Sequence, residues 1–71
     1  MSNPQATSTH SSKKVLRLHK VIEKTGMSRA TIYAYLKIRN FPAPISLGER
    51  SVGWLESEVD QWIDSRIALR G

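Results

Sequence analysis

Side chains that could contact DNA recur along residues 28–37 at the spacing of a helix. Arg29, Tyr33 and Lys37 are four residues apart and would lie on one face. A guanidinium can pair with guanine through two hydrogen bonds, and a phenol or an ammonium can reach phosphates. Ala30 and Ala34 share that face and are small enough to permit close approach. We therefore predict a DNA-recognition helix here, with an ordinary solvated helix face as the alternative.

A turn must position this helix against the rest of the domain. Gly26 tolerates the left-handed backbone that closes a preceding helix. The side-chain oxygen of Ser28 can accept a backbone N–H and start the next helix. Met27 lies between them and would fill the corner between the two helices. A helix, a glycine-containing turn and a second helix together are typical of the helix-turn-helix.

Both helices of this motif have an apolar inner face. The first is predicted over residues 19–25, with Val21 and Ile22 turned inward. The second is expected to end near Arg39 or Asn40, because Asn is, after Gly, the residue best suited to a left-handed cap. Residues three or four apart share its inner face, namely Ile32, Tyr35, Leu36 and Arg39, and the first three are apolar enough for the core.

A short β-hairpin is expected after the second helix. Residues 41–44 contain two prolines and read as an extended connector. Segments 45–47 and 51–54 alternate in polarity and flank a glycine-bearing turn at 48–50. A hairpin beside a helix-turn-helix is a wing, and Arg50 would stand at or next to its tip. We favour a phosphate contact for Arg50 over a solvated loop charge.

The third helix is predicted from Leu55 to about Leu69. Trp62 and the preceding Trp54 are expected to anchor the core. An acidic ridge at i, i+4 and i+8 is interpreted as solvated or, alternatively, as facing the basic surface of a neighbouring copy or a partner protein; its residues are Glu56, Asp60 and Asp64. The apolar stripe of this helix comprises Leu55, Val59, Trp62, Ile63 and Ile67.

The positive charge is concentrated around the helix-turn-helix. The chain has 71 residues and a net charge of +5. Residues 13–40 contain eight basic residues and one acidic residue, a net of +7, whereas residues 41–71 contain three and five, a net of −2. This asymmetry favours a polyanionic partner such as double-stranded DNA. Residues 1–12 are polar and are predicted to form a disordered tail, and residues 13–71 to form one small DNA-binding domain.

Several other functions are not supported by the residues present. The chain has no cysteine, no nucleophile–base set and no glycine-rich phosphate loop, so we expect no enzyme, metal or cofactor. His19 and Glu23, at i and i+4, are better interpreted as an exposed ion pair than as metal ligands. No segment resembles a signal peptide or membrane span, so we expect a cytoplasmic protein without a membrane or small-molecule partner.

Taken together, these motifs resemble the AlpA family of phage and genomic-island regulators. The resemblance implies a mainly α, MerR-like winged helix-turn-helix with three helices and a wing. The matching residues are Leu16-Arg17-Leu18, Val21, Thr25-Gly26-Met27-Ser28-Arg29, Thr31-Ile32-Tyr33, Phe41-Pro42, Leu47-Gly48, Arg50, Val52-Gly53-Trp54-Leu55-Glu56-Ser57-Glu58-Val59 and Trp62-Ile63.

The resemblance also implies sequence-specific DNA binding, in transcriptional control or as a recombination directionality factor (excisionase) that directs an integrase toward excision. Integrase and neighbouring copies of the chain are then expected partners. Ala34 is a departure, because relatives often have a basic residue there. The alternative is a small adaptor or recombinase inhibitor that acts through the acidic third helix. The residues expected to contact DNA are Ser28, Arg29, Ala30, Thr31, Tyr33 and Lys37 on the recognition helix and Arg50 on the wing.

Overall fold

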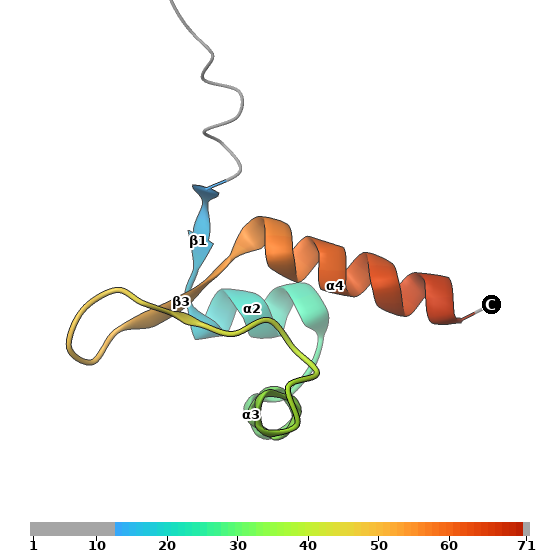
Figure 1. The fold of residues 1–71 in the computed structure, drawn as a ribbon, viewed down its shortest axis with the longest axis horizontal. Helices are drawn as coiled ribbons and strands as arrows, with labels where there is room; N and C mark the ends of the chain where they lie inside the picture. Colours follow the sequence, from blue (N-terminus) through green and yellow to red (C-terminus); the bar gives the residue numbers. More distant parts are fainter. Residues whose placement is uncertain (1–12, 71) are drawn as a thin grey trace, which may run out of the picture.

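The computed structural model describes residues 13–70, in which three helices pack around a small sheet (Figure 1). The predicted fold class is confirmed, because the chain is mainly α-helical with a hairpin wing beside a helix-turn-helix. The tail predicted at residues 1–12 lies outside the described range. The elements are β1 (Val15–Leu16), α2 (Leu18–Thr25), α3 (Arg29–Lys37), β2 (Ile45–Ser46), β3 (Val52–Leu55) and α4 (Glu56–Leu69).

Helix α2 ends at the predicted glycine. Gly26 has a φ of 74°, and its N–H donates to the carbonyl of Ile22 at 2.8 Å. The Thr25 hydroxyl donates to the carbonyl of Val21 and accepts from the N–H of Met27 at 3.2 Å. Carbonyls and N–H groups that the end of a helix leaves unpaired are thereby satisfied within a few residues. The predicted left-handed cap at Gly26 is confirmed.

Helix α3 ends differently from the prediction. The left-handed residue is Arg39, with a φ of 59°, and not Asn40. The Asn40 N–H donates to the Tyr35 carbonyl at 2.8 Å, and the Arg39 N–H donates to the Leu36 carbonyl at 3.1 Å. This pair of bonds is the Schellman motif, in which the residue after the cap takes the left-handed conformation. Because α3 stops at Lys37, that position falls on Arg39, which is therefore exposed and not part of the inner face.

The wing is part of a three-stranded antiparallel sheet with the order β1-β3-β2. The hairpin of β2 and β3 confirms the prediction, whereas the pairing of β1 with β3 was not anticipated, because two residues are too few to show strand periodicity. Gly53 permits this packing, since a Cβ there would lie 2.5 Å from a methyl carbon of Val15. Strand β3 continues through Leu55, so α4 begins at Glu56, one residue later than predicted.

The core joins the sheet, the three helices and the connector after α3. Trp54 is fully buried, and its indole N–H donates to the Pro42 carbonyl at 3.0 Å, as expected of a core anchor. Trp62 is half-buried and packs against this core at its edge, where its ring lies against Phe41, so the second predicted anchor is confirmed in part. The buried apolar residues are Leu16, Val21, Ile32, Phe41, Trp54 and Val59.

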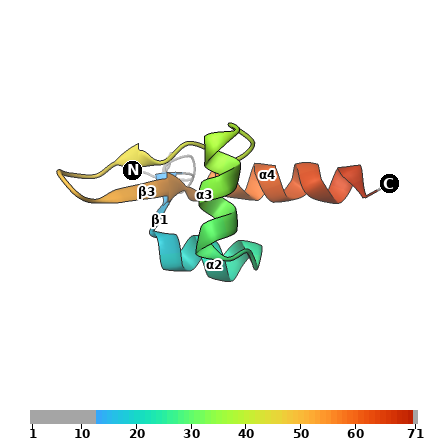
Figure 2. The same cartoon turned by 90° about the horizontal axis from the view of Figure 1, so that it is seen from below.

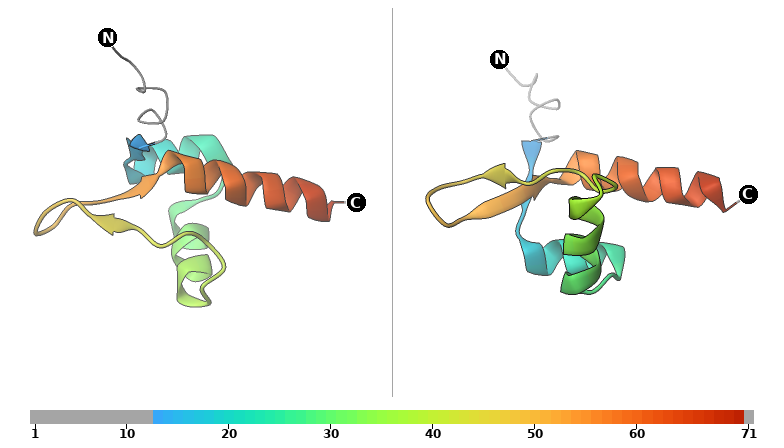
Figure 3. Two further views of the ribbon diagram at one scale, coloured as in Figure 1. Left: turned by 45° about the horizontal axis from the view of Figure 1, so that its top comes forward. Right: turned by 60° about the horizontal axis from the view of Figure 1, so that its bottom comes forward.

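Helix α4 extends past the rest of the fold (Figures 1 and 3). Its first turns pack on the sheet and bury Val59 completely. Toward its end the predicted apolar stripe leaves the core, and Ile67 remains 50% exposed. Leu69, the last residue of α4, is 74% exposed. The apolar stripe is continuous along α4. Because α2 is six residues shorter than α4, the last turns of α4 have less structure to pack against.

Candidate nucleic-acid interface

The start of α3 is capped by the predicted side chain. The Ser28 hydroxyl oxygen accepts the Thr31 N–H at 3.1 Å, which confirms the N-cap. The same hydroxyl donates to the Thr31 hydroxyl at 3.0 Å. Both side chains are therefore engaged in building the helix end, although Ser28 is exposed and Thr31 is half-buried. Ser28 fixes the point at which Arg29, the first residue of α3, leaves the turn.

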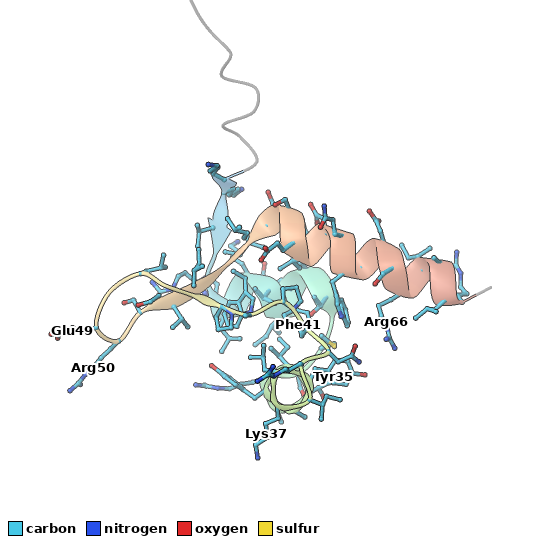
Figure 4. The ribbon with its side chains drawn as sticks, viewed as in Figure 1. Tyr35, Lys37, Phe41, Glu49, Arg50 and Arg66 are labelled. Carbon is cyan, nitrogen blue, oxygen red and sulfur yellow. The ribbon has the colours of Figure 1, made fainter. Side chains whose placement is uncertain are left out.

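The orientation of α3 follows from its one fully buried residue. Ile32 is completely inaccessible to solvent and holds the inner face against the core. Arg29, Tyr33 and Lys37 are exposed on the other side, together with Ala30 and Ala34. Seen from below, α3 crosses the front of the molecule (Figure 2), and Lys37 points away from the body (Figure 4). The residues predicted for the recognition face thus share one accessible surface.

The wing adds a cation to this surface. Arg50 lies at the hairpin tip and projects from the body beside Glu49 (Figure 4). Arg50 and Tyr33, 17 positions apart in sequence, line the same shallow hollow. The other side chains around this hollow are Arg17, Leu18, His19 and Val52. The fold therefore brings the wing and the outer face of α3 together on one side of the molecule.

Two polar members of this hollow, Arg17 and His19, were missed as site residues. They stand before and within the first turn of α2, where Arg17 is the N-cap residue. Arg17 carried a weak sequence signal for DNA binding, because it is one of the basic residues of segment 13–40. The proximity of Arg17 and His19 to the wing depends on the tertiary fold. His19 does not form the expected ion pair, since Glu23 pairs with Lys20 at 3.6 Å. The flexible Lys20 side chain reaches that carboxylate across three residues, while His19 faces the hollow.

Two acidic side chains of α4 form ion pairs within the chain. Lys24 lies 2.9 Å from a carboxylate oxygen of Asp60 and 3.2 Å from one of Glu56. The hydrogen bond to Asp60, followed by that to Glu56, raises the pKa of Lys24 above its usual value of 10.5. Two residues of the predicted acidic ridge thus clamp α4 to α2 and do not form a wholly solvated or partner-facing ridge. Within residues 13–70, the cations Arg29, Lys37 and Arg50 form no side-chain ion pair.

The described residues provide little for other chemistry. In residues 13–70, no three His, Asp or Glu side chains gather closely enough to hold a metal ion. Among the helices of this range, none has the length and apolar character needed to cross a membrane. What the surface combines is a capped helix with an accessible basic face, a wing cation and a hollow between them. Such a combination suits the major groove and its flanking phosphates.

Comparisons with known proteins point in the same direction. The family model described as "Prophage CP4-57 regulatory protein (AlpA)" matches residues 14–67. The chain is 47% identical to the "DNA-binding transcriptional activator AlpA" of Escherichia coli strain K12, with 79% of this chain and 89% of that protein covered. It is 46% identical to the "Uncharacterized protein ORF88" of Enterobacteria phage P4; the match covers 78% of this chain and 62% of that protein.

Proposed function

Because the chain belongs to the AlpA family, whose model spans residues 14–67, we propose that it is a sequence-specific DNA-binding regulator of a prophage or genomic island. The observation that carries the proposal is the accessible face of α3, which shares one side of the molecule with the wing cation Arg50. The 47% identical relative, named a DNA-binding transcriptional activator, supports the same role. In this proposal the protein binds bacterial DNA in the cytoplasm and catalyses no reaction.

The α3 side chains divide into base-reading and backbone-binding groups in this proposal. Arg29, at the first turn, pairs with a guanine edge in the major groove. Tyr33 and Lys37, one and two turns further on, hold phosphates and set the register of the helix. Ala30 lets the helix backbone approach the bases closely. Ser28 and Thr31 contribute chiefly through the cap that orients Arg29, because their hydroxyls are already bonded to one another.

The hollow beside α3 receives the DNA backbone. Arg50 reaches the phosphates next to the recognition helix, and Arg17 and His19 line the wall of the same hollow. An Arg from the wing and an Arg from the start of α2 would then hold one stretch of backbone from two sides. Each phosphate that they neutralise releases counterions, which makes the affinity dependent on salt.

Transcriptional activation is the primary output that we propose. Excision of the integrated element, with the chain as a directionality factor for an integrase, is the finer alternative that the family resemblance suggests. A single copy of this small domain buries a limited area on DNA, so tight binding would involve neighbouring copies on adjacent sites. The acidic-helix adaptor is less favoured, because Glu56 and Asp60 are bonded to Lys24 within the chain.

The experiment is fluorescence anisotropy with two duplexes at low and physiological salt. One duplex carries the promoter and attachment region near the chain's own gene, and the other is a scrambled sequence. Arg29→Ala is expected to cost about 1–3 kcal/mol on the native duplex and to relax specificity. Lys37→Ala should weaken binding to both duplexes alike and reduce the salt slope by about one. Arg70→Ala is the matched control, because it removes one charge at the far end of α4.

The outcomes separate specific recognition from general attraction. Preference of the wild-type chain for the native duplex at physiological salt, lost in Arg29→Ala, supports the proposal. Equal and salt-sensitive binding to both duplexes would reduce the basic face to an electrostatic footprint. An equal loss in Arg29→Ala and Arg70→Ala would exclude a base-reading role for Arg29. A reporter assay and an excision assay with the same variants then distinguish the two outputs.

A further inference from the structure

An apolar groove lies where α2 ends beneath the last turns of α4. Met27, from the turn after α2, lines it together with Ile63 and Ile67 of α4. Arg66 and Arg70 stand along the same groove. We name this surface, defined by these five residues, the α4 groove. It takes no part in the DNA-binding surface proposed above.

The α4 groove leaves apolar area exposed that the core does not use. Ile67 is 50% exposed, whereas Val59, two turns earlier on the same helix, is completely buried. Ile63 and Met27 pack against the core only in part. Covering a half-exposed aliphatic side chain in a groove with apolar neighbours lowers the free energy, so such a groove favours the binding of a partner.

The α4 groove carries positive charge from two arginines. Within residues 13–70, Arg66 and Arg70 form no ion pair with any carboxylate side chain. The guanidinium of Arg66 stands over the Trp62 ring, 5.5 Å from its centroid. Lys24, at the α2 side, is held by Asp60 and Glu56 of its own chain. A partner that binds the α4 groove should therefore carry anionic groups that pair with Arg66 and Arg70.

The α4 groove lies apart from the wing along the length of the molecule, although its Arg66 points to the same lower side as Lys37 (Figure 4). The wing and the C-terminal end of α4 lie at opposite ends of the molecule (Figures 1 and 2). Lys37 and Arg50, two of the proposed DNA contacts, point away from the body on the lower side and at the wing end (Figure 4). A partner in the groove would thus approach from the end of the molecule farthest from the wing.

We propose that the α4 groove docks an acidic, amphipathic helix of another protein, whose apolar side chains cover Ile63 and Ile67 and whose carboxylates pair with Arg66 and Arg70. Helices commonly bind apolar grooves in this way. A second copy of the chain is a poorer occupant, because two carboxylates of its own acidic helix, Glu56 and Asp60, are committed to Lys24. This inference rests on the proposed function, since the docked helix would belong to the machinery that the DNA-bound chain recruits.

The test separates recruitment from DNA binding in the full chain. Ile67→Glu and Arg70→Glu are assayed for promoter activation or excision and, in parallel, for affinity to the native duplex. Each is expected to lower the output roughly tenfold or more, the loss typical of a residue central to an interface, with DNA affinity almost unchanged. Leu69→Glu is the matched control for Ile67→Glu, because Leu69 is 74% exposed and does not line the groove. Arg70→Lys, which keeps the charge, should retain the output.

Further measurements identify the occupant. Suppressors that restore output to Arg70→Glu should replace Asp or Glu with Lys or Arg in a different protein. Equal loss of output in Leu69→Glu and Ile67→Glu, or no loss in Ile67→Glu, would overturn the proposal. A change in sedimentation or in cooperative DNA occupancy caused by Ile67→Glu would assign the groove to a second copy and overturn it as well. Failure of the wild-type chain to prefer the native duplex is a separate result, which refutes the proposed function itself.

Discussion

The two ends of α3 are held in different ways, although both decide where its outer face points. At the start, Ser28 caps the helix through the N–H of Thr31, three residues away. At the other end, the indole N–H of Trp62 donates to the Asn40 carbonyl at 2.8 Å across 22 residues. The Trp62 ring also meets Phe41 edge-on, with 4.9 Å between centroids. The entry to α3 thus depends on its neighbours in sequence, whereas its exit has local bonds of Arg39 and Asn40 and also depends on the docking of α4.

This difference has a consequence for function. A change at Ser28, in the turn before α3, acts on the helix start and on the position of Arg29. A change at Trp62 disturbs the link between α4 and the segment that follows α3. Because the α4 groove is on the same helix as Trp62 and also includes Met27, the residue before Ser28, a docked partner would contact residues beside both ends of α3.

The largest effect is expected from Trp62→Ala. It removes the indole donor and the ring packed on Phe41, and should lower the free energy of unfolding by about 3 kcal/mol, the lower end of the range for large aromatic truncations. Trp62→Phe keeps a ring there and should cost about 1 kcal/mol for the lost hydrogen bond. Urea unfolding followed by circular dichroism measures both. A loss below about 1 kcal/mol in the alanine variant would show that α4 does not hold the exit of α3.

Ser28→Ala tests the other end of α3. Loss of the cap should lower the free energy of unfolding by about 1 kcal/mol. Ser28→Asp is the matched variant, because a carboxylate caps as well as a hydroxyl and should keep the stability. The same carboxylate should weaken DNA binding in anisotropy, because it adds a negative charge to the surface proposed to bind DNA. If the aspartate variant is as unstable as the alanine variant, the Ser28 hydroxyl contributes something other than the cap.

Arg39→Gly should stabilise the exit of α3. Arg39 is the non-glycine residue with a positive φ among residues 13–70, at 59°. Glycine adopts this conformation without a Cβ clash, so the gain should reach up to about 1 kcal/mol. Arg39→Ala removes the same charge but keeps the strain, and should give no gain. The midpoint of thermal unfolding compares the three chains, and equal midpoints for Gly and Ala would locate the strain elsewhere.

Lys24→Met is expected to have the smallest effect on stability, because the ion pairs that it removes are partly exposed. Asp60 and Glu56 raise the pKa of Lys24 above 10.5, so the folded state holds this proton more tightly than the unfolded chain does. The contribution is therefore complete below the unfolded pKa and disappears as the pH rises through the raised value. The difference in unfolding midpoint between wild type and variant should follow this course. A difference that persists above the raised pKa would show that the Lys24 ion pairs do not stabilise the fold.

The sequence predicted the caps on either side of the turn correctly, but not the cap at the end of α3. The caps at Gly26 and Ser28 each involve partners within four residues, and both are confirmed. The end of α3 was misplaced, because Asn40 is the better left-handed residue by type but the helix stops too early for it. Trp62 has the spacing of a core residue but is only half-buried, because helical periodicity does not indicate where the rest of the fold ends.

The sequence by itself determined the order of helices and wing, the caps of the turn and the basic face of α3, because these depend on residue type and local spacing. Only the tertiary structure decided that β1 joins the wing sheet, that Arg17 and His19 line a hollow with Arg50, and that Lys24 binds the acidic start of α4. These contacts join segments that are more than 30 residues apart. Which residues meet in these contacts depends on how the core packs, and the sequence pattern of a single segment does not indicate it.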